Sequence, residues 1–296
     1  MLEHLLTEQR NPASAAIDSL ATEDALRVIN AEDRKVADAV AAEIPHVARA
    51  VDAVVAAMER GGRLFYIGAG TSGRLGVLDA SECPPTFNVD PSRVQGIIAG
   101  GVDALWRSSE ATEDDPATGV RDLLQRGFSA TDVLCGIAAS GRTPYVLGAV
   151  AEANRMGAVT IGISGTPGSE LARAAQIAIT PLTGPEVLTG STRMKAGTAQ
   201  KMVLNMLSTG VFVRLGYVYG NLMVNVQPTN TKLMDRARRI VAQAAGVSPE
   251  GAAQLLADAG GQVRTAIVME RKHISREATD ELLARSGGRV SQALHG

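Results

Sequence analysis

Residues 68–73, Gly-Ala-Gly-Thr-Ser-Gly, combine the spacing of a nucleotide-binding turn with two side-chain hydroxyl groups. The three glycines match the G-x-G-x-x-G pattern that binds the pyrophosphate of a dinucleotide. That pattern also needs an acidic residue about twenty positions later, at the end of a second strand, to bind the ribose. Asp90 stands near that spacing, but it precedes the next apolar run, and Pro84-Pro85 disfavours a strand there. The sequence therefore argues against a nicotinamide or flavin site.

The hydroxyl groups of Thr71 and Ser72 indicate a site for a phosphate group instead. A turn between a strand and a helix directs backbone N–H groups toward an anion, and the helix dipole adds attraction. Residues 138–143, Ala-Ala-Ser-Gly-Arg-Thr, form a second such turn before Pro144. For one turn alone, a hydroxyl that caps the next helix is the simpler explanation. Two turns at the carboxyl edge of one sheet favour phosphate binding. The candidate binding residues are Thr71, Ser72, Gly73, Ser140, Gly141 and Thr143.

Short apolar runs alternate with helix-like segments and predict the sheet that these turns leave. The runs cover residues 63–70, 94–101, 132–141, 158–165 and 176–182. Residues 14–60, 144–157 and about 191–214 have the composition and spacing of helices. Strands that are apolar throughout and alternate with helices are typical of a parallel sheet covered on both faces. The fold class is therefore α/β. Neither turn has the Lys-Ser/Thr ending of a P-loop, so hydrolysis of a nucleoside triphosphate is not indicated.

An internal repeat occupies the C-terminal part of the chain. Residues 248–267 align without a gap to residues 275–294, and the matched positions include a serine at the start and a Gly-Gly pair. Each copy predicts a serine N-cap, an amphipathic helix, a Gly-Gly stop and a second short helix. We expect the two copies to pack as a small helical bundle that serves packing or dimer contact rather than catalysis.

Composition excludes several classes of function. The net charge of −2 offers no basic surface for nucleic acid or an anionic membrane, and aromatic residues make up only 3% of the chain. No apolar stretch is long enough to span a bilayer, and the N-terminus lacks the pattern of a secretory signal. Two distant cysteines and four scattered histidines predict no metal site. We expect a cytoplasmic protein without a metal.

Three motifs resemble a known enzyme family. The turn at 138–143 and its strand look like a sugar isomerase (SIS) domain, a phosphosugar-binding module. Residues 68–87, 184–201 and 6–20 resemble the N-acetylmuramic acid 6-phosphate etherases more narrowly. The similarity runs along nearly the whole chain. It implies a parallel-sheet sandwich of SIS type, with N-terminal helices (1–60), a phosphosugar-binding domain (61–240) and a C-terminal helical bundle (241–296).

The resemblance also implies a reaction. Members of the family are lyases that cleave the D-lactyl ether of N-acetylmuramic acid 6-phosphate with water. The products are N-acetylglucosamine 6-phosphate and D-lactate. This amino-sugar metabolism belongs to the recycling of cell-wall peptidoglycan. Family members act in the cytoplasm as homodimers, without a metal or other cofactor, so the implied partners are a phosphosugar and a second copy of the chain.

Such a reaction needs two acid–base groups. Opening of the sugar ring acidifies the proton at C2, so the lactate at C3 can leave by elimination, and water then adds to the unsaturated aldehyde. Two carboxyl groups with different pKa values can serve as base and acid. Glu82 is the first candidate, since apolar surroundings near Pro84, Pro85 and Phe87 would raise its pKa. We assign it lactate protonation and water activation.

The second carboxyl group lies in residues 107–119. These residues alone are typical of a solvated acidic loop, and the resemblance to the family selects Glu113, with Glu110 as the alternative. We assign Glu113 to the C2 proton or to substrate positioning. The 184–201 motif adds Glu186, Ser191 and Lys195 as candidate substrate-binding residues, and Ser191 could also cap the helix that follows.

Two other functions share parts of this pattern. A non-catalytic phosphosugar sensor that regulates a sugar kinase has the same SIS architecture, but it has no use for an acid–base pair. Aldose–ketose isomerisation shares ring opening and removal of the C2 proton, but it leaves the full motif match unexplained. Glu82 and Glu113 therefore favour the lyase.

Overall fold

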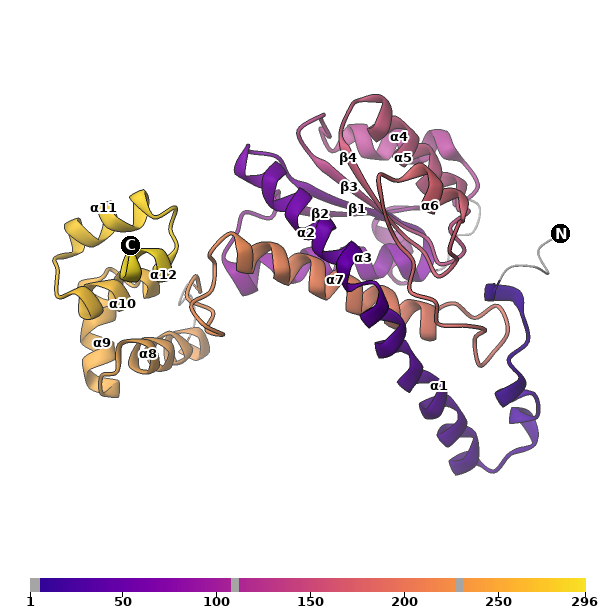
Figure 1. The fold of residues 1–296 in the computed structure, drawn as a ribbon, viewed down its shortest axis with the longest axis horizontal. Helices are drawn as coiled ribbons and strands as arrows, with labels where there is room; N and C mark the ends of the chain where they lie inside the picture. The colour runs from indigo at the N-terminus through magenta and orange to yellow at the C-terminus, as the bar shows by residue number, and fades with distance from the viewer. Residues whose placement is uncertain (1–5, 108–111, 227–230) are drawn as a thin grey trace. The chain divides into compact units, whose positions relative to one another are not determined.

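A five-stranded parallel sheet forms the centre of the first of two compact units (Figure 1). The structure is a computed structural model that describes residues 6–107, 112–226 and 231–296. Each predicted apolar run contains a strand, and the strands are β1 (Leu64–Gly68), β2 (Val94–Ile98), β3 (Val133–Ile137), β4 (Val159–Ile163) and β5 (Ile177–Ile179). Their order across the sheet is β2-β1-β3-β4-β5, and all neighbours run parallel.

The strand order reverses direction at β1. The chain passes from β1 to β2 on one side, and then to β3 on the other side. Gly68 pairs with Ile98 of β2 and with Ile137 of β3, so the three strands end at the same level. In open α/β sheets of this order, ligands bind outside the carboxyl ends of the strands at the point of reversal. The turns after β1 and β3 flank that point.

Helices cover both faces of the sheet, which confirms the predicted α/β layers (Figure 1). Their close approach depends on small residues: a Cβ at Gly136 would lie 2.8 Å from Val146, and one at Gly76 would lie 2.9 Å from Tyr66. The central strands β1 and β3 are entirely buried, as their apolar sequences require, while β2 and β5 at the edges of the sheet are partly accessible. The covering helices are α2 (Ile44–Glu59), α3 (Gly70–Phe87), α4 (Pro116–Gln125), α5 (Pro144–Arg155), α6 (Glu170–Ala174) and α7 (Lys195–Arg214).

The N-terminal segment is less regular than its sequence suggests. Instead of helix from residue 14 onward, short 3-10 turns precede helix α1 (Thr22–Ala42). Glu43 then separates α1 from α2, and Pro45 lies in the first turn of α2. Proline has no N–H to donate and is tolerated at the start of a helix, so the chain begins a new helix here.

Helix α3 contains two prolines. It continues past Glu82 and through Pro84 and Pro85 to Phe87. The two prolines cannot donate backbone hydrogen bonds, but their carbonyl groups still accept them. The N–H of Asn88 donates to the oxygen of Pro84 at 2.8 Å, and Asn88, with a positive φ of 51°, ends the helix.

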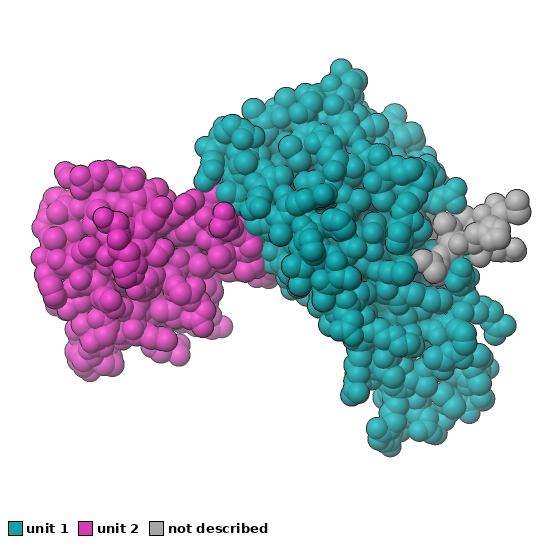
Figure 2. Space-filling view, viewed as in Figure 1, with its two compact units in different colours: residues 1–81, 91–208 teal, residues 82–90, 209–296 magenta. Residues whose placement is uncertain are grey.

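The second compact unit comprises residues 82–90 and 209–296 (Figure 2). Helix α8 (Thr231–Ala245) runs across residue 240, where the sequence places the start of the C-terminal bundle, so this unit reaches further back along the chain. The other helices of the unit are α9 (Pro249–Asp258), α10 (Val263–Lys272), α11 (Arg276–Arg285) and α12 (Val290–His295).

The two copies of the sequence repeat have the same local structure in the second unit. Ser248 accepts a hydrogen bond from the N–H of Gly251 at 3.1 Å, and Ser275 accepts one from Ala278 at 3.3 Å, so both serines cap their helices. The Gly260-Gly261 and Gly287-Gly288 pairs all have positive φ and end the first helix of each copy. Buried side chains from α8 to α12 form one shared core.

Asp79 joins three elements of the first unit. Its carboxylate accepts hydrogen bonds from Tyr66 of β1 at 2.9 Å and from Ser208 of α7 at 3.0 Å. Burial raises the pKa of Asp79 from 3.8 to about 6, although these hydrogen bonds oppose the shift. Between pH 4 and 6, the folded chain therefore keeps a proton that the unfolded chain has lost. Stability falls as pH rises through this range.

Replacing Asp79 with Asn should remove this pH dependence. The amide is close in size and stays neutral, so we expect Asp79→Asn to gain stability relative to the parent as pH rises from 4 to 7. The gain should reach about 1–3 kcal/mol, since one pKa unit corresponds to about 1.4 kcal/mol. Urea unfolding at pH 4, 5, 6 and 7 measures the difference. A difference that does not change with pH would contradict the assignment.

Candidate functional site

The turn after β1 holds strand and helix in unusually close contact. A Cβ at Gly68 would lie 2.7 Å from the backbone nitrogen of Gly73, and a Cβ at Gly73 would lie 2.6 Å from Ile98. Gly70 has a positive φ of 52°, which favours glycine. The glycine spacing thus serves the tight strand-to-helix turn itself, as in other phosphate-binding turns.

Thr71 and Ser72 in this turn face the beginning of helix α7. A Cβ at Gly197 would lie 3.4 Å from the methyl group of Thr71, so the two residues are in van der Waals range. Ser72 is buried, and its hydroxyl donates to the side-chain oxygen of Gln200 at 2.9 Å. The Ser72 hydroxyl therefore bonds to a residue of another helix rather than capping α3.

The turn after β3 also depends on a glycine. Gly141 has a positive φ of 67°, and a Cβ there would overlap the side chain of Ser169. The Ser140 hydroxyl accepts a hydrogen bond from the N–H of Arg142 at 3.3 Å. Thr143 is the N-cap residue of α5, but its side chain makes no capping hydrogen bond. Capping therefore does not account for the Thr143 hydroxyl, which strengthens the phosphate-binding interpretation.

Three strand ends meet the start of helix α7. Thr71 follows β1, Ala139 follows β3 and Gly165 follows β4. A Cβ at Gly165 would lie 3.4 Å from the carbonyl oxygen of Ala139 and 3.9 Å from the Cβ of Ala196 in α7. The two predicted phosphate turns and the first turn of α7 therefore surround the same carboxyl edge of the sheet.

Glu113 lies beside both turns. A Cβ at Gly70 would lie 3.5 Å from a carboxylate oxygen of Glu113, and the backbone oxygen of Glu113 accepts a hydrogen bond from Tyr145 at 3.1 Å. The half-buried carboxylate thus lies near the start of α3, while the backbone of Glu113 contacts the first turn of α5. The alternative carboxylate, Glu110, lies outside the described residues. The placement brings Glu113 together with the hydroxyl turns.

Glu82 belongs to the part of α3 that lies in the second unit. Its side chain is exposed, while the neighbouring Cys83 is buried. The apolar enclosure expected around Glu82 is therefore not formed by the described residues of one chain. Its role as an acid stays a prediction.

Helix α7 begins at Lys195, four residues later than the sequence suggests, and Ser191 does not cap it. The carboxylate of Glu186 takes that place: it accepts the N–H groups of Lys195 and Ala196, both at 2.9 Å. A negative charge at a helix start also interacts favourably with the helix dipole. Glu186 is almost fully buried, so its carboxylate has a structural task beside the predicted site.

Lys195 forms a buried ion pair with Glu32 of helix α1. The two charged atoms are 2.6 Å apart, and the two residues are 1% and 3% exposed. Asn11 donates a further hydrogen bond to Glu32 at 2.8 Å, and Lys35 a third at 2.5 Å. Burial alone would raise the pKa of Glu32, but its hydrogen bonds to Lys195, Lys35 and Asn11 lower it to about 2. The charge on Lys195 is therefore balanced inside the chain.

Sequence reasoning missed Glu32 and Gln200. Glu32 lies within a helix whose other charged residues are mostly exposed, so its spacing gave no sign of burial. Gln200 falls within the 184–201 motif, but its residue type carries no acid–base or nucleophilic chemistry. Only the pairing of Ser72 with Gln200 in space marks it.

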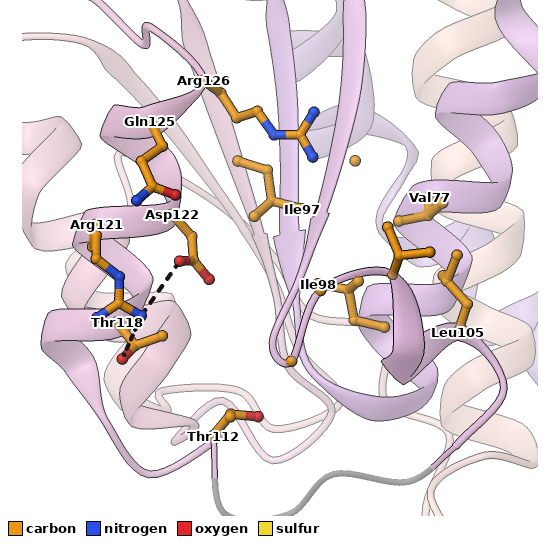
Figure 3. A pocket seen from close by; sticks show the side chains of 14 residues that line it. Val77, Ile97, Ile98, Leu105, Thr112, Thr118, Arg121, Asp122, Gln125 and Arg126 are labelled. Carbon is orange, nitrogen blue, oxygen red and sulfur yellow. Dashed lines mark hydrogen bonds and ion pairs between the residues drawn. The ribbon is translucent and has the colours of Figure 1, made fainter.

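A separate cavity of about 420 Å³ lies beside the edge strand β2 (Figure 3). Its apolar wall includes Ile97, Ile98 and Leu105, and helix α4 contributes Arg121 and Asp122. None of the predicted site residues that the structure describes lines this cavity. Within the described parts of the chain, no three His, Cys, Asp or Glu side chains are grouped as metal ligands.

The fold and the paired hydroxyl turns define a SIS-type α/β protein. Residues 46–154 match the glucokinase regulatory protein N-terminal SIS domain, and residues 124–210 match the SIS domain family. A phosphoheptose isomerase structure from Francisella tularensis has a TM-score of 0.47 and 19% identity, covering 66% of this chain and all of that one.

More similar sequences identify the family. The chain is 57% identical to the N-acetylmuramic acid 6-phosphate etherase of Aeromonas hydrophila, over 90% of each chain. It is 56% identical to that of Pectobacterium atrosepticum, over 90% of this chain and 88% of the other. The chain belongs to the N-acetylmuramic acid 6-phosphate etherase family.

Replacing Glu32 with Gln keeps the size of the side chain but removes the charge that balances Lys195. We expect the free energy of unfolding at pH 7 to fall by about 3–5 kcal/mol, because one member of a buried ion pair is left alone. Urea unfolding followed by circular dichroism measures the change. Glu23→Gln, which removes the exposed pair with Arg27, is the matched control and should cost less than about 1 kcal/mol. Equal losses in the two variants would refute the structural role of Glu32.

Proposed function

We propose that the chain cleaves the D-lactyl ether of N-acetylmuramic acid 6-phosphate and releases N-acetylglucosamine 6-phosphate and D-lactate. The observation that carries this proposal is the 56–57% identity to etherases over about 90% of the chain. The two hydroxyl turns at the point of strand reversal support it, because a 6-phosphate group needs such donors. This activity would place the protein in peptidoglycan recycling.

The chemistry explains why a phosphosugar site should carry carboxylates. A C3 ether is a poor leaving group, and direct displacement at a crowded carbon is slow. In the open-chain sugar, the C1 aldehyde acidifies the C2 proton. A base removes that proton, the C3–O bond breaks and an acid protonates the departing lactate oxygen. Water then adds at C3 of the unsaturated aldehyde, and a proton returns to C2.

We assign the two acid–base tasks to Glu113 and Glu82. Glu113 would take the C2 proton or position the substrate, and its carboxylate beside Gly70 supports this assignment. Glu82 would protonate the lactate and then activate water. Thr71, Ser72, Gly73, Ser140, Gly141 and Thr143 would bind the phosphosugar. The proposed substrate-binding set also includes Glu186, Ser191 and Lys195. Glu186 caps helix α7 and Lys195 pairs with Glu32, so these two residues would also hold the start of that helix in place.

A second candidate function is phosphosugar sensing without catalysis. The match of residues 46–154 to the glucokinase regulatory protein N-terminal SIS domain favours it. A sensor would bind N-acetylglucosamine 6-phosphate without releasing lactate from the etherase substrate, so one assay separates the two functions.

We further propose a homodimer in the cytoplasm. Leu26 and Ile44 in the N-terminal helices are 59% and 51% exposed, and such apolar side chains suit contact with a second copy. Among the described residues, no helix combines the length and hydrophobicity needed to cross a bilayer. Size-exclusion chromatography with light scattering measures the oligomeric state.

Lactate release tests the proposed reaction directly. Incubation with N-acetylmuramic acid 6-phosphate should yield D-lactate and N-acetylglucosamine 6-phosphate in equal amounts. In deuterated water, the sugar product should carry deuterium at C2, because the proton removed there exchanges with solvent before it returns. Mass spectrometry and NMR read both results. Folded protein that releases no lactate would overturn the etherase activity, and lactate release without deuterium at C2 would overturn the elimination route.

Neutral substitutions test the two carboxylates. We expect Glu82→Gln and Glu113→Gln each to lower kcat by about 10²–10⁴-fold, the usual contribution of an acid–base group, and to keep phosphosugar binding. Asp114→Asn, at the exposed neighbour of Glu113, is the matched control and should stay within about twofold. Glu110→Gln tests the alternative: a loss of kcat in this variant, with near-normal kcat in Glu113→Gln, would make Glu110 the second carboxylate. Near-normal turnover in Glu82→Gln or Glu113→Gln would remove that residue from its assigned role.

A further inference from the structure

Gln200 has a buried donor without a partner. Its side chain is 2% exposed, and its Nε2 atom makes no hydrogen bond in the described chain. Leaving such a donor unsatisfied costs its full desolvation penalty, so buried unpaired donors are rare. The atom lies beside the phosphate turn, because the other end of the same amide accepts the Ser72 hydroxyl.

The direction of this hydrogen bond conflicts with anion binding. Ser72 donates its proton to Oε1 of Gln200. The oxygens of a phosphate dianion only accept hydrogen bonds, so Ser72 can donate to that dianion only if its proton turns away from Gln200. In the arrangement described, the amide holds the Ser72 proton and leaves its own N–H group unused.

A half-turn of the amide resolves both problems. It exchanges Oε1 and Nε2, so that Nε2 donates to the Ser72 oxygen and the Ser72 proton is released toward the ligand. The atom left without a partner is then a carbonyl oxygen, which is tolerated more readily than an unpaired N–H. The result is a chain of donors, from Nε2 to Ser72 Oγ to a phosphate oxygen, in which each bond strengthens the next.

We propose that Gln200 is a positioning residue that sets the direction of the Ser72 proton and thereby the affinity of the site for phosphosugars. This inference rests on the proposed phosphosugar site. In this proposal Gln200 acts through its hydrogen bond with Ser72 rather than by contact with the ligand. Helix α7 holds it in place, since the Glu186 carboxylate anchors the start of that helix.

A double-mutant cycle tests whether Gln200 acts through Ser72. Binding of inorganic phosphate and of N-acetylglucosamine 6-phosphate is measured by calorimetry, which does not depend on turnover. We expect Gln200→Met to raise both Kd values about five- to tenfold, the size of one hydrogen bond. Ser72→Ala should raise them by at least as much. In the Ser72→Ala background, Gln200→Met should have no further effect, because its partner is gone.

A charged substitution tests the direction of the proton. In Gln200→Glu, the carboxylate accepts the Ser72 proton and has no N–H to return, so we expect Kd for phosphate to rise by more than in Gln200→Met. Asn205→Asp places the same charge on an exposed position of α7 and serves as the control, with an expected change below about twofold. Steady-state kinetics separate binding from turnover in the Gln200 variants. We expect KM for N-acetylmuramic acid 6-phosphate to rise in parallel with Kd, while kcat stays within about twofold of the parent value.

Each outcome bears on a different claim. Unchanged binding in Gln200→Met, or losses that multiply with those of Ser72→Ala, would overturn the role of Gln200 while leaving the proposed function intact. Equal effects of Gln200→Glu and Asn205→Asp would do the same. If the unchanged protein binds neither phosphate nor the phosphosugar, both the proposed function and this inference fail. Melting curves of every variant confirm that the compared proteins are folded.

Discussion

The buried ion pair between Lys195 and Glu32 fixes the position from which helix α7 starts. It joins residues far apart in the chain, and Asn11 extends the same network to the N-terminal segment. The first turns of α7 then bring Gly197 to Thr71 and Gln200 to Ser72. The geometry of the predicted phosphate-binding turns therefore depends on a buried ion pair at the start of helix α7.

Local sequence is sufficient to predict the sheet and its turns. Strands such as β1 and β3 are apolar throughout, and they are followed by glycine and hydroxyl residues whose conformations are locally determined. The start of α7 could not be predicted in this way. Its N–H groups are satisfied by Glu186, nine residues before Lys195, rather than by the adjacent residue that capping rules consider. Helix α3 likewise continues through Pro84 and Pro85, although proline has no backbone N–H to donate within a helix.

Some residues of the candidate site can likewise be predicted from local sequence, and others cannot. Hydroxyl groups at strand ends can be found from residue type and spacing. Glu113, whose carboxylate lies near Gly70, is selected only by the resemblance to the family. Glu32 and Gln200 act through burial and through partners more than a hundred residues away, as the bond from Ser72 to Gln200 shows. Burial of a polar side chain depends on how the whole chain packs, so a local sequence pattern does not predict it.

The repeat in the second unit has a consequence for how such a bundle can originate. One copy, with two short helices joined by Gly-Gly, is too small to bury a stable core by itself. An isolated copy would need a further apolar surface, such as helix α8 or a second copy, and two separate copies would assemble with a stability that depends on protein concentration. Two copies in tandem, residues 248–267 and 275–294, meet at an effective concentration set by the short linker between them. Joining the copies thus turns an assembly reaction into the folding of a single chain.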